Sequence, residues 1–443
     1  MGRSSGFLAK TKKILKVLGP GLITGASDDD PSGIATYSQA GAQFGLKTLW
    51  TALITFPLMA GIQEMCARIG LVTTVGLTTT LKRHYPKWLL YLMMVFSIPA
   101  IILNIGADIA GMGAVANLIF PSIKPMVFSV AFTLILFILI VFLPYEKIVT
   151  FLKYLCLSMF LYIAVPFFTH PDWTQVLRNT FIPTLRFDKD FIEILVAILG
   201  TTISPYLFFW QVTMEAEDVK HANAKQLILA RRKLIRPNGK EHPDKREQSF
   251  VIRLIKKMQL DVNSGMLLSS IVMFFIILAT GTALNLHGIK HIDTVEQAAK
   301  ALEPVAGKAS YLLFALGVIG TGMLAIPVLT GSLSYIVAET FGWRASLNKK
   351  YWQAKRFYFV ILVSLLAGLS INYIGLSPIK ALFYTAILYG LTCPILIAIV
   401  LHIGNNKKIM NQYTNSTLSN TLGFLTLIIM TAAAASLIYF QFV

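Results

Sequence analysis

Three consecutive carboxylates stand within an apolar stretch near the start of the chain. The sequence reads LGPGLITGA over residues 18–26 and continues as SDDDPSGIATY from Ser27 to Tyr37. A carboxylate in the hydrocarbon layer of a membrane is costly and usually marks a functional site. Carboxylate, hydroxyl and carbonyl oxygens are the protein ligands of Mg²⁺ and Ca²⁺, so cation binding is the chemistry that this stretch could do.

Pro31 predicts that the helix breaks directly after the third acid. Proline has no N–H to donate, and it disfavours helical geometry at the preceding residue, Asp30. Irregular backbone at membrane depth is tolerated only where it lines a cavity or is buried in protein. A loop at the membrane surface is the alternative, but GIATYSQAGAQFG continues the helical pattern beyond the proline. We therefore expect a discontinuous helix with Asp30 at the break.

The three acids are expected to have different roles. Successive side chains of a helix point ~100° apart, so three neighbouring acids cannot all face one ion. Asp30, at the break, is the expected ligand. For Asp28 and Asp29 three roles stay open: binding a water of the ion's hydration shell, attracting cations, or capping N–H groups that the break leaves free.

The elements that must position these acids are membrane-spanning helices. The 443 residues are 55% hydrophobic and only 14% charged, and the mean hydropathy is +0.66. A soluble chain of this length would carry far more charge. Apolar runs of near ~20 residues, the length that crosses a bilayer, recur along the chain and predict an all-α integral membrane protein of about eleven helices. The expected spans are roughly 18–42, 48–72, 88–118, 125–144, 148–169, 191–213, 259–284, 309–338, 357–375, 379–402 and 420–442.

The net charge of +18 follows the expected membrane topology. With the N-terminus in the cytoplasm, 30 of the 39 Lys and Arg fall on the cytoplasmic side, which predicts a cytoplasmic N-terminus and an external C-terminus. Twelve of them lie between residues 220 and 257, as a solvated loop or in contact with anionic lipid. We expect a cell-membrane protein (plasma or inner membrane) surrounded by lipid, without nucleic acid or an obligate protein partner.

No catalytic constellation is visible, so we expect neither an enzyme nor a bound cofactor. Nothing in the sequence resembles an ATP-binding loop or a Ser/His/Asp set. Cys66, Cys156 and Cys393 lie far apart in apolar segments, without the paired spacing of a disulfide framework or a zinc site. Glu64 and Arg68 are four residues apart and predict a salt bridge within one helix.

A second proline inside an apolar span predicts a second broken helix. LGTTISPYLFFW, residues 199–210, places Pro205 within the sixth span. Interrupted spans at corresponding positions of two halves mark the binding site of transporters built from inverted repeats. Helices 1–5 and 6–10 would then form the repeats. The expected division is a basic tail at 1–17, a repeat at about 18–169, a repeat at about 191–402 and an extra helix at about 420–442.

The first two spans carry the motifs of a known family. GPGLITGASDDDPSGIATYSQAGAQFG, followed by LWTALITFPLMAGIQEMCARIGLVT, resembles the NRAMP family of divalent-metal transporters. That family has a GPG start, an Asp-Pro-Gly-Asn break, a GAQFG-type ending and a second span that closes on ARLG. The resemblance is strong over about residues 18–75, weaker through the sixth span and thin beyond it. It implies a LeuT-type fold with helices 1 and 6 broken, and transport of a divalent metal cation into the cytoplasm.

The resemblance implies a metal site whose residues depart from the family pattern. Asp30 matches the Asp of the break, whereas Gly33 stands where the family has its metal-binding Asn. The family's sixth span reads Ala-Thr-Val-Met-Pro-His. Thr201 stands at the Ala whose carbonyl faces the metal, Ser204 at the metal-binding Met and Tyr206 at the His.

The third span resembles the family's Ala-Thr-Asp-Leu-Ala-Glu segment. In GADIAGMGA, Asp108 is retained, while Gly111 stands at the Glu that the family associates with proton movement. Asn104 shares a helix face with Asp108, so this face either lines the ion path or packs as a polar pair. Ser32 is a further residue that could line the site.

The replacements predict a preference for hard ions. Methionine sulfur favours transition metals, and Ser204 in its place leaves an all-oxygen set suited to Mg²⁺ or Ca²⁺. Gly33 and Ser32 are small and leave room for a partly hydrated ion. The pattern resembles the NRAMP-related magnesium transporters, a branch that lacks the same Asn and Met. We expect Mg²⁺ transport. The alternatives are a proton-coupled Mn²⁺ or other transition-metal transporter and, more distantly, an amino-acid symporter of the same fold.

Transport is expected not to be strictly coupled to protons, because Gly111 and Tyr206 replace the family's proton-handling residues and leave Asp108 as the remaining candidate. The membrane potential alone supplies ~4.6 kcal/mol per divalent ion at 100 mV. In proteoliposomes containing a pH-sensitive dye, metal entry should leave the internal pH unchanged. Protein-dependent acidification in step with metal entry would contradict the expectation.

Overall fold

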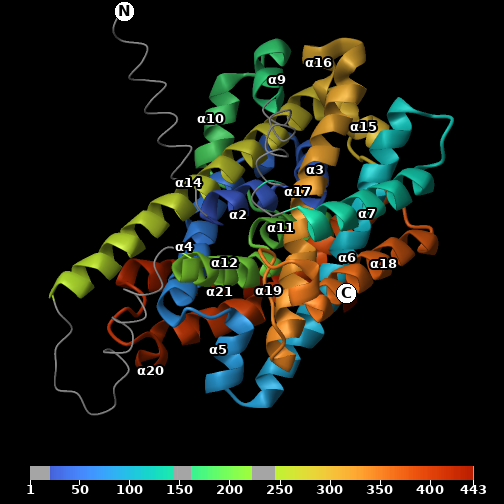
Figure 1. The fold of residues 1–443 in the computed structure, drawn as a ribbon. Coiled ribbons are helices and arrows are strands. Elements are labelled where there is room, and N and C mark those ends of the chain that lie inside the picture. The colour runs from blue at the N-terminus through green and yellow to red at the C-terminus, as the bar shows by residue number, and fades with distance from the viewer. Residues whose placement is uncertain (1–19, 144–146, 148–160, 222–244, 443) are drawn as a thin grey trace, which may run out of the picture.

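The computed structural model describes residues 20–143, 147, 161–221 and 245–442. Every regular element within these ranges is an α- or 3₁₀-helix, and the described residues contain no strand (Figure 1). The predicted tail at 1–17 and Cys156 lie outside the described residues. The all-helical class that the sequence predicts is confirmed.

Helices occupy the predicted spans. The principal helices are α2 (Pro20–Asp28), α3 (Pro31–Phe44), α4 (Trp50–Thr73), α6 (Lys87–Ile119), α7 (Pro125–Phe142), α9 (Leu161–Thr169), α11 (Lys189–Thr202), α12 (Pro205–His221), α14 (Lys245–Ala283), α17 (Ser310–Phe341), α18 (Lys355–Ile371), α19 (Pro378–Asn405) and α21 (Thr417–Phe442). Shorter helices connect them, among them α5 (Leu77–His84), α10 (Trp173–Phe181), α15 (Val295–Ala299), α16 (Glu303–Ala306) and α20 (Lys407–Met410).

Seven helical segments of the described part are long and apolar enough to cross a membrane, or eight if α3 and α4, bent by 109°, count as one span. The sequence predicts eleven spans. The first predicted span is divided between two short helices, and α18 has only 17 residues. The fifth is described only from Leu161. The number eleven therefore stays a prediction, although helix occupies the described part of each range.

Both predicted helix breaks are present. α2 ends at Asp28 and α3 begins at Pro31 with Asp30 as its N-cap. Asp30 has the extended backbone (φ −69°, ψ 176°) that an N-cap requires, and Pro31 occupies the first helical position, where its missing N–H costs nothing. α11 ends at Thr202 and α12 begins at Pro205, which leaves Ile203 and Ser204 between them.

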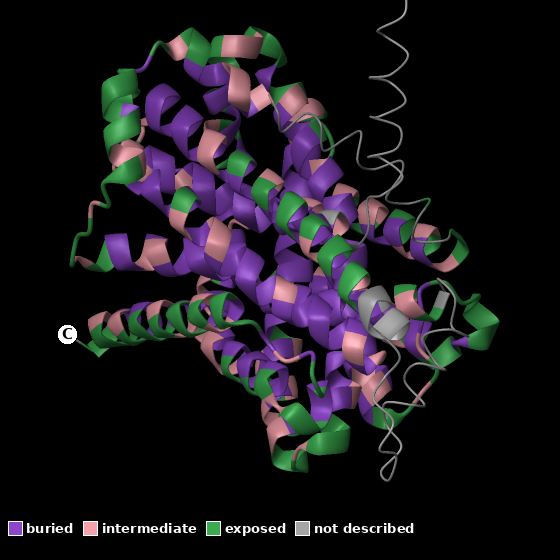
Figure 2. Ribbon diagram, turned by 90° about the vertical axis from the view of Figure 1, so that its left-hand side faces the viewer, coloured by how far each residue is buried: buried purple, intermediate pink, exposed green. Residues whose placement is uncertain are grey.

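The broken helices lie inside the bundle. α2 and α3 pack against α14, α11 packs against α19, and α6 contacts both α17 and α19. Figure 2 shows buried residues throughout these inner helices, whereas the C-terminal helix α21 is exposed along one side. The exposed residues of α21 include Phe424, Ile428 and Ile438, each more than half exposed. An apolar exterior of this kind suits contact with lipid, whereas the acids at the first helix break lie inside the bundle.

Close backbone contact fixes α2 against α14. A Cβ atom built on Gly25 would lie 2.3 Å from the carbonyl carbon and oxygen of Gly265. Small residues at a helix interface allow the backbones of membrane helices to approach in this way. Gly25 therefore holds the first half of the broken helix in place.

We expect Gly25→Ala to destabilise the protein by about 1–3 kcal/mol, because the methyl group must force two backbones apart. Gly111→Ala is the matched control. Its Cβ would meet the movable Cδ1 atom of Leu382 at 3.2 Å, which can shift by a few tenths of an ångström. Thermal unfolding in detergent measures both. Equal melting temperatures for the two variants would show that α2 is not held by this contact.

Candidate metal site

Asp30 is buried at the break between α2 and α3, with only 1% of its surface exposed. Its Oδ1 accepts hydrogen bonds from the Ser32 hydroxyl (2.6 Å) and the Gly33 N–H (2.8 Å). Its Oδ2 accepts one from Nδ2 of Asn104 on α6 (3.0 Å). A carboxylate has about four acceptor positions, so these bonds orient Asp30 and still leave it able to bind an ion. The N-cap alone explains the bond to Gly33, but it does not explain the contact with Asn104.

Two more buried oxygen-bearing side chains come from α6. Asn104 and Asp108 are one helical turn apart, and both are fully buried. Oδ1 of Asn104 and both carboxylate oxygens of Asp108 have no hydrogen-bond partner among the described residues. Asp108 stands one helical turn beyond Asn104, whose amide donates to Asp30. Buried polar atoms are nearly always paired, so oxygens left open beside a second carboxylate point to a bound cation.

The second broken helix meets the first at this place. The hydroxyl of Thr201, near the end of α11, lies 3.3 Å from that of Ser32. The Ser204 hydroxyl donates to the Thr201 carbonyl at 2.5 Å, so it closes the broken end of α11. The Tyr206 hydroxyl donates to the Ser27 carbonyl at 2.8 Å and ties α12 to the last turn of α2.

These contacts assign each predicted residue a place. Asp30, Asn104 and Asp108 are brought together, although the sequence singled out Asn104 and Asp108 only as possible lining of the path. Gly33 adjoins Thr201, because a Cβ on Gly33 would lie 3.4 Å from the Thr201 hydroxyl. The two residues of the sixth predicted span, Thr201 and Ser204, bond to each other in this state, so their role as metal ligands stays a prediction.

Asp28 and Asp29 lie on the α2 side of the break. Both are buried, at 0% and 6% exposed. The Ser269 hydroxyl of α14 lies 2.9 Å from Oδ2 of Asp28 and 3.1 Å from Oδ1 of Asp29. Neither carboxylate accepts a hydrogen bond from a backbone N–H within the described part of the chain, so the capping role is not observed. The sequence analysis did not single out Ser269, because a serine in an apolar span is an ordinary feature and Ser270 follows it directly.

The acids at the break lack cationic partners. Glu64–Arg68, Arg186–Asp188 and Lys380–Asp293 are ion pairs of this fold. Within the described part of the chain, no ion pair includes Asp28, Asp29, Asp30 or Asp108. Burying a carboxylate without a counter-charge is expensive. Four such groups make this region the candidate metal site of the chain.

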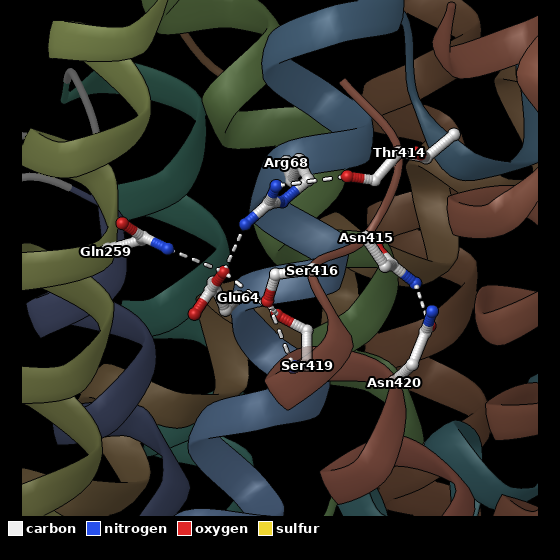
Figure 3. A network of polar contacts seen from close by, with 8 residues as sticks. All are labelled: Glu64, Arg68, Gln259, Thr414, Asn415, Ser416, Ser419 and Asn420. Carbon is white, nitrogen blue, oxygen red and sulfur yellow. Dashed lines mark hydrogen bonds and ion pairs between the residues drawn. The ribbon is translucent and has the colours of Figure 1, made fainter. Parts of the chain in front are cut away.

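Glu64 is an acid with a structural role, because its carboxylate is paired with a cation and with hydrogen-bond donors. The predicted salt bridge is confirmed: Arg68 lies 2.5 Å from Oε1 of Glu64. The same oxygen accepts from Gln259 of α14 (2.8 Å) and from Ser419 of α21 (3.3 Å), as Figure 3 shows. Arg68 also donates to the carbonyl of Thr414 at 3.3 Å. This network satisfies the charge of Glu64 and joins α4 to α14 and α21, in contrast to the open oxygens of Asp108.

The site is closed to solvent in this structure. Thr201 and Ser204 are 1% and 2% exposed, and Asp30 is equally buried. On the side of α15, apolar side chains of α3, α6, α17 and α19 surround a cavity of about 10 Å³, barely room for one water.

Comparison with known proteins identifies the family. The sequence model of the Nramp family, described as natural resistance-associated macrophage protein-like, matches residues 21–440. A protein of Caldanaerobacter subterraneus, named divalent metal cation transporter MntH, is 25% identical over 420 residues, which cover 94% of this chain and 90% of the relative. The protein of the same name from Clostridium acetobutylicum is 23% identical and covers 100% of this chain and 95% of the relative.

Solved structures share the fold. A manganese transporter of Eremococcus coleocola superposes with a TM-score of 0.72 at 19% identity, covering 99% of this chain and 88% of that chain. Mhp1, a nucleobase-cation-symport-1 family transporter, superposes with a TM-score of 0.55 at 13% identity, covering 95% of this chain and 91% of that chain. Since the family model spans nearly the whole chain, the protein belongs to the Nramp family: it is a multi-pass integral membrane protein of LeuT-type fold that transports divalent metal cations.

Proposed function

We propose that the chain imports Mg²⁺ through a site built from oxygen ligands alone. The observation that carries the proposal is the pair Asp30 and Asp108 with the Asn104 amide oxygen, buried together and without a counter-charge. Carboxylate, carbonyl and water oxygens suit Mg²⁺, Ca²⁺ and Mn²⁺, and Mg²⁺ is usually held by one or two carboxylates while it keeps some of its waters. Without a soft ligand, the site has little means of rejecting Mg²⁺.

Mn²⁺ is the second candidate, and the comparisons favour it. The relatives are named divalent metal cation transporters, and the superposed structure is that of a manganese transporter. Mn²⁺ also accepts oxygen ligands, so the donor set admits it. Competition between the two ions, rather than the fold, distinguishes the candidates.

The proposed orientation in the membrane rests on the charge distribution, and the proposed direction of transport rests on the membrane potential. With a cytoplasmic N-terminus, as the excess of Lys and Arg on one side predicts, α2 runs from the cytoplasm to the break. We place the protein in the cell membrane, where an inward-negative potential drives cation entry by ~2.3 kcal/mol per charge at 100 mV. Antibody access to tags at each terminus in intact cells tests this orientation.

Removing either carboxylate of the site should impair transport of Mg²⁺ and Mn²⁺ alike. Asp30→Ala deletes a charge at the meeting point of the two broken helices and should abolish uptake. Asp108→Asn keeps the shape of the side chain and should weaken metal affinity roughly tenfold or more, equivalent to ~1.4 kcal/mol.

Ion uptake into proteoliposomes measures both variants. Asp188→Asn is the matched control, because it removes an aspartate that caps α11 at the exposed surface, where asparagine caps equally well. Normal uptake by a correctly folded Asp30→Ala protein would overturn the assignment of the site.

Selectivity is expected to depend on Gly33 and Ser204. Gly33→Asn together with Ser204→Met restores the amide and thioether of the family motif. A Cβ on Gly33 makes only ordinary contacts of 3.4 Å, so the backbone accepts a side chain there. The double variant should favour Mn²⁺ over Mg²⁺, because sulfur adds nothing to Mg²⁺ binding and the narrower site demands that Mg²⁺ shed more water.

The measurement is the concentration of Mg²⁺ that blocks half of Mn²⁺ uptake. It should rise roughly tenfold in the double variant, a change of ~1.4 kcal/mol in relative binding. If the wild-type protein already carries micromolar Mn²⁺ in the presence of millimolar Mg²⁺, the Mg²⁺ proposal is wrong and Mn²⁺ takes its place.

A further inference from the structure

The acids Asp28 and Asp29 have a geometry that the site at Asp30 does not explain. They stand on the last turn of α2 and just beyond it, where α2 packs against α14. Their carboxylates share one neighbour, the Ser269 hydroxyl, at 2.9 and 3.1 Å. They do not belong to the motif that the chain shares with the NRAMP family.

One hydroxyl group cannot satisfy both carboxylates. The Ser269 hydroxyl carries a single hydrogen, so it donates to Asp28 or to Asp29 but not to both at once. Oδ1 of Asp28 has no hydrogen-bond partner among the residues that the structure describes, although the side chain is fully buried. Both carboxylates lie close to one another, because each approaches the same hydroxyl oxygen. Asp28, Asp29 and Ser269 therefore have more hydrogen-bond acceptors than donors, and the negative charge of the two carboxylates has no positive partner within the described part of the chain.

We propose that Asp28, Asp29 and Ser269 form a second divalent-cation site on the α2 side of the break. A divalent ion between the carboxylates supplies the missing charge, and it occupies the open oxygen of Asp28. Ser269 then contributes its hydroxyl oxygen. The all-oxygen ligand set is of the kind that binds Mg²⁺ or Mn²⁺. This inference rests on the proposed function, since it assigns a second binding site to the same transported ion.

Buried polar groups continue from this second site along α2. Thr24, one turn before Asp28, donates to Gln211 of α12, and Gln211 donates to Glu215 at 3.2 Å. Further along, the Gly21 N–H donates to Asp261 of α14 at 2.7 Å. With α2 entering from the cytoplasm, the second site lies between the Asp30 site and the cytoplasmic end of α2. An ion leaving Asp30 would therefore reach Asp28 and Asp29 next.

Counting bound Mn²⁺ tests the second site separately from the first. Purified full-length protein is equilibrated with Mn²⁺, and bound metal is measured by dialysis and electron paramagnetic resonance. The wild type should bind two ions per chain. Asp28→Asn with Asp29→Asn should bind one, and Asp30→Ala should also bind one. The control, Asp188→Asn with Asp190→Asn, removes the same charge at the surface and should bind two.

A single substitution tests the second site even if the double variant, Asp28→Asn with Asp29→Asn, fails to fold. Ser269→Ala leaves both carboxylates in place and should weaken binding of the second ion roughly tenfold while binding of the first is unchanged. The rate of uptake should fall in Asp28→Asn with Asp29→Asn, because release of the ion to the cytoplasm is impaired. The external ion concentration that gives half-maximal uptake should stay as in the wild type.

The outcomes separate the two proposals. One ion in the wild type, retained in Asp28→Asn with Asp29→Asn and lost in Asp30→Ala, would overturn the second site and leave the proposed function intact. An unchanged second affinity in a folded Ser269→Ala protein would also count against it. No bound divalent ion in the wild type would overturn both proposals together.

Discussion

Buried negative charge without a protein counter-charge is the constraint around which this structure is organised. Asp28, Asp29, Asp30 and Asp108 are all at least nine-tenths buried, and none forms an ion pair with another described residue. Such charge would destabilise a resting protein unless it were compensated, and a metal ion is the natural compensation. In the proposed function, the cost of burying these acids is the source of affinity for the cation.

The broken helices make that arrangement compatible with a membrane. Freed backbone groups at membrane depth need partners, and side chains of this chain provide them: Asp30 accepts from Gly33, Ser204 donates to Thr201, and Tyr206 donates to Ser27. The last contact is informative because Tyr206 stands where the family has a histidine. Here the position serves as a tie between the two broken helices.

The helices around the site are held by contacts of a different kind. Gly25 allows α2 to lie directly on α14, and the Glu64 network joins α4 to α14 and α21. In that network every charge is paired, so it stabilises the bundle without attracting an ion. The acid of the scaffold, Glu64, is paired with a cation and hydrogen-bond donors. The candidate site holds acid oxygens without such partners among the described residues.

The sequence by itself determined the membrane class, the helical spans and the two breaks. The spans are a local property, because a run of apolar residues fixes each of them. Proline alone does not decide a break, since Pro57, Pro99 and Pro327 lie within continuous helices. The breaks at Pro31 and Pro205 were predicted because glycine and polar residues accompany each proline. The resemblance of the first two spans to the NRAMP family was likewise readable from consecutive residues. Only the tertiary structure decided which polar groups meet: Asn104 reaches Asp30 across 74 residues, and Ser269 reaches Asp28 across 241. Periodicity places a residue on a helix face but not opposite a partner, because that depends on how the helices pack.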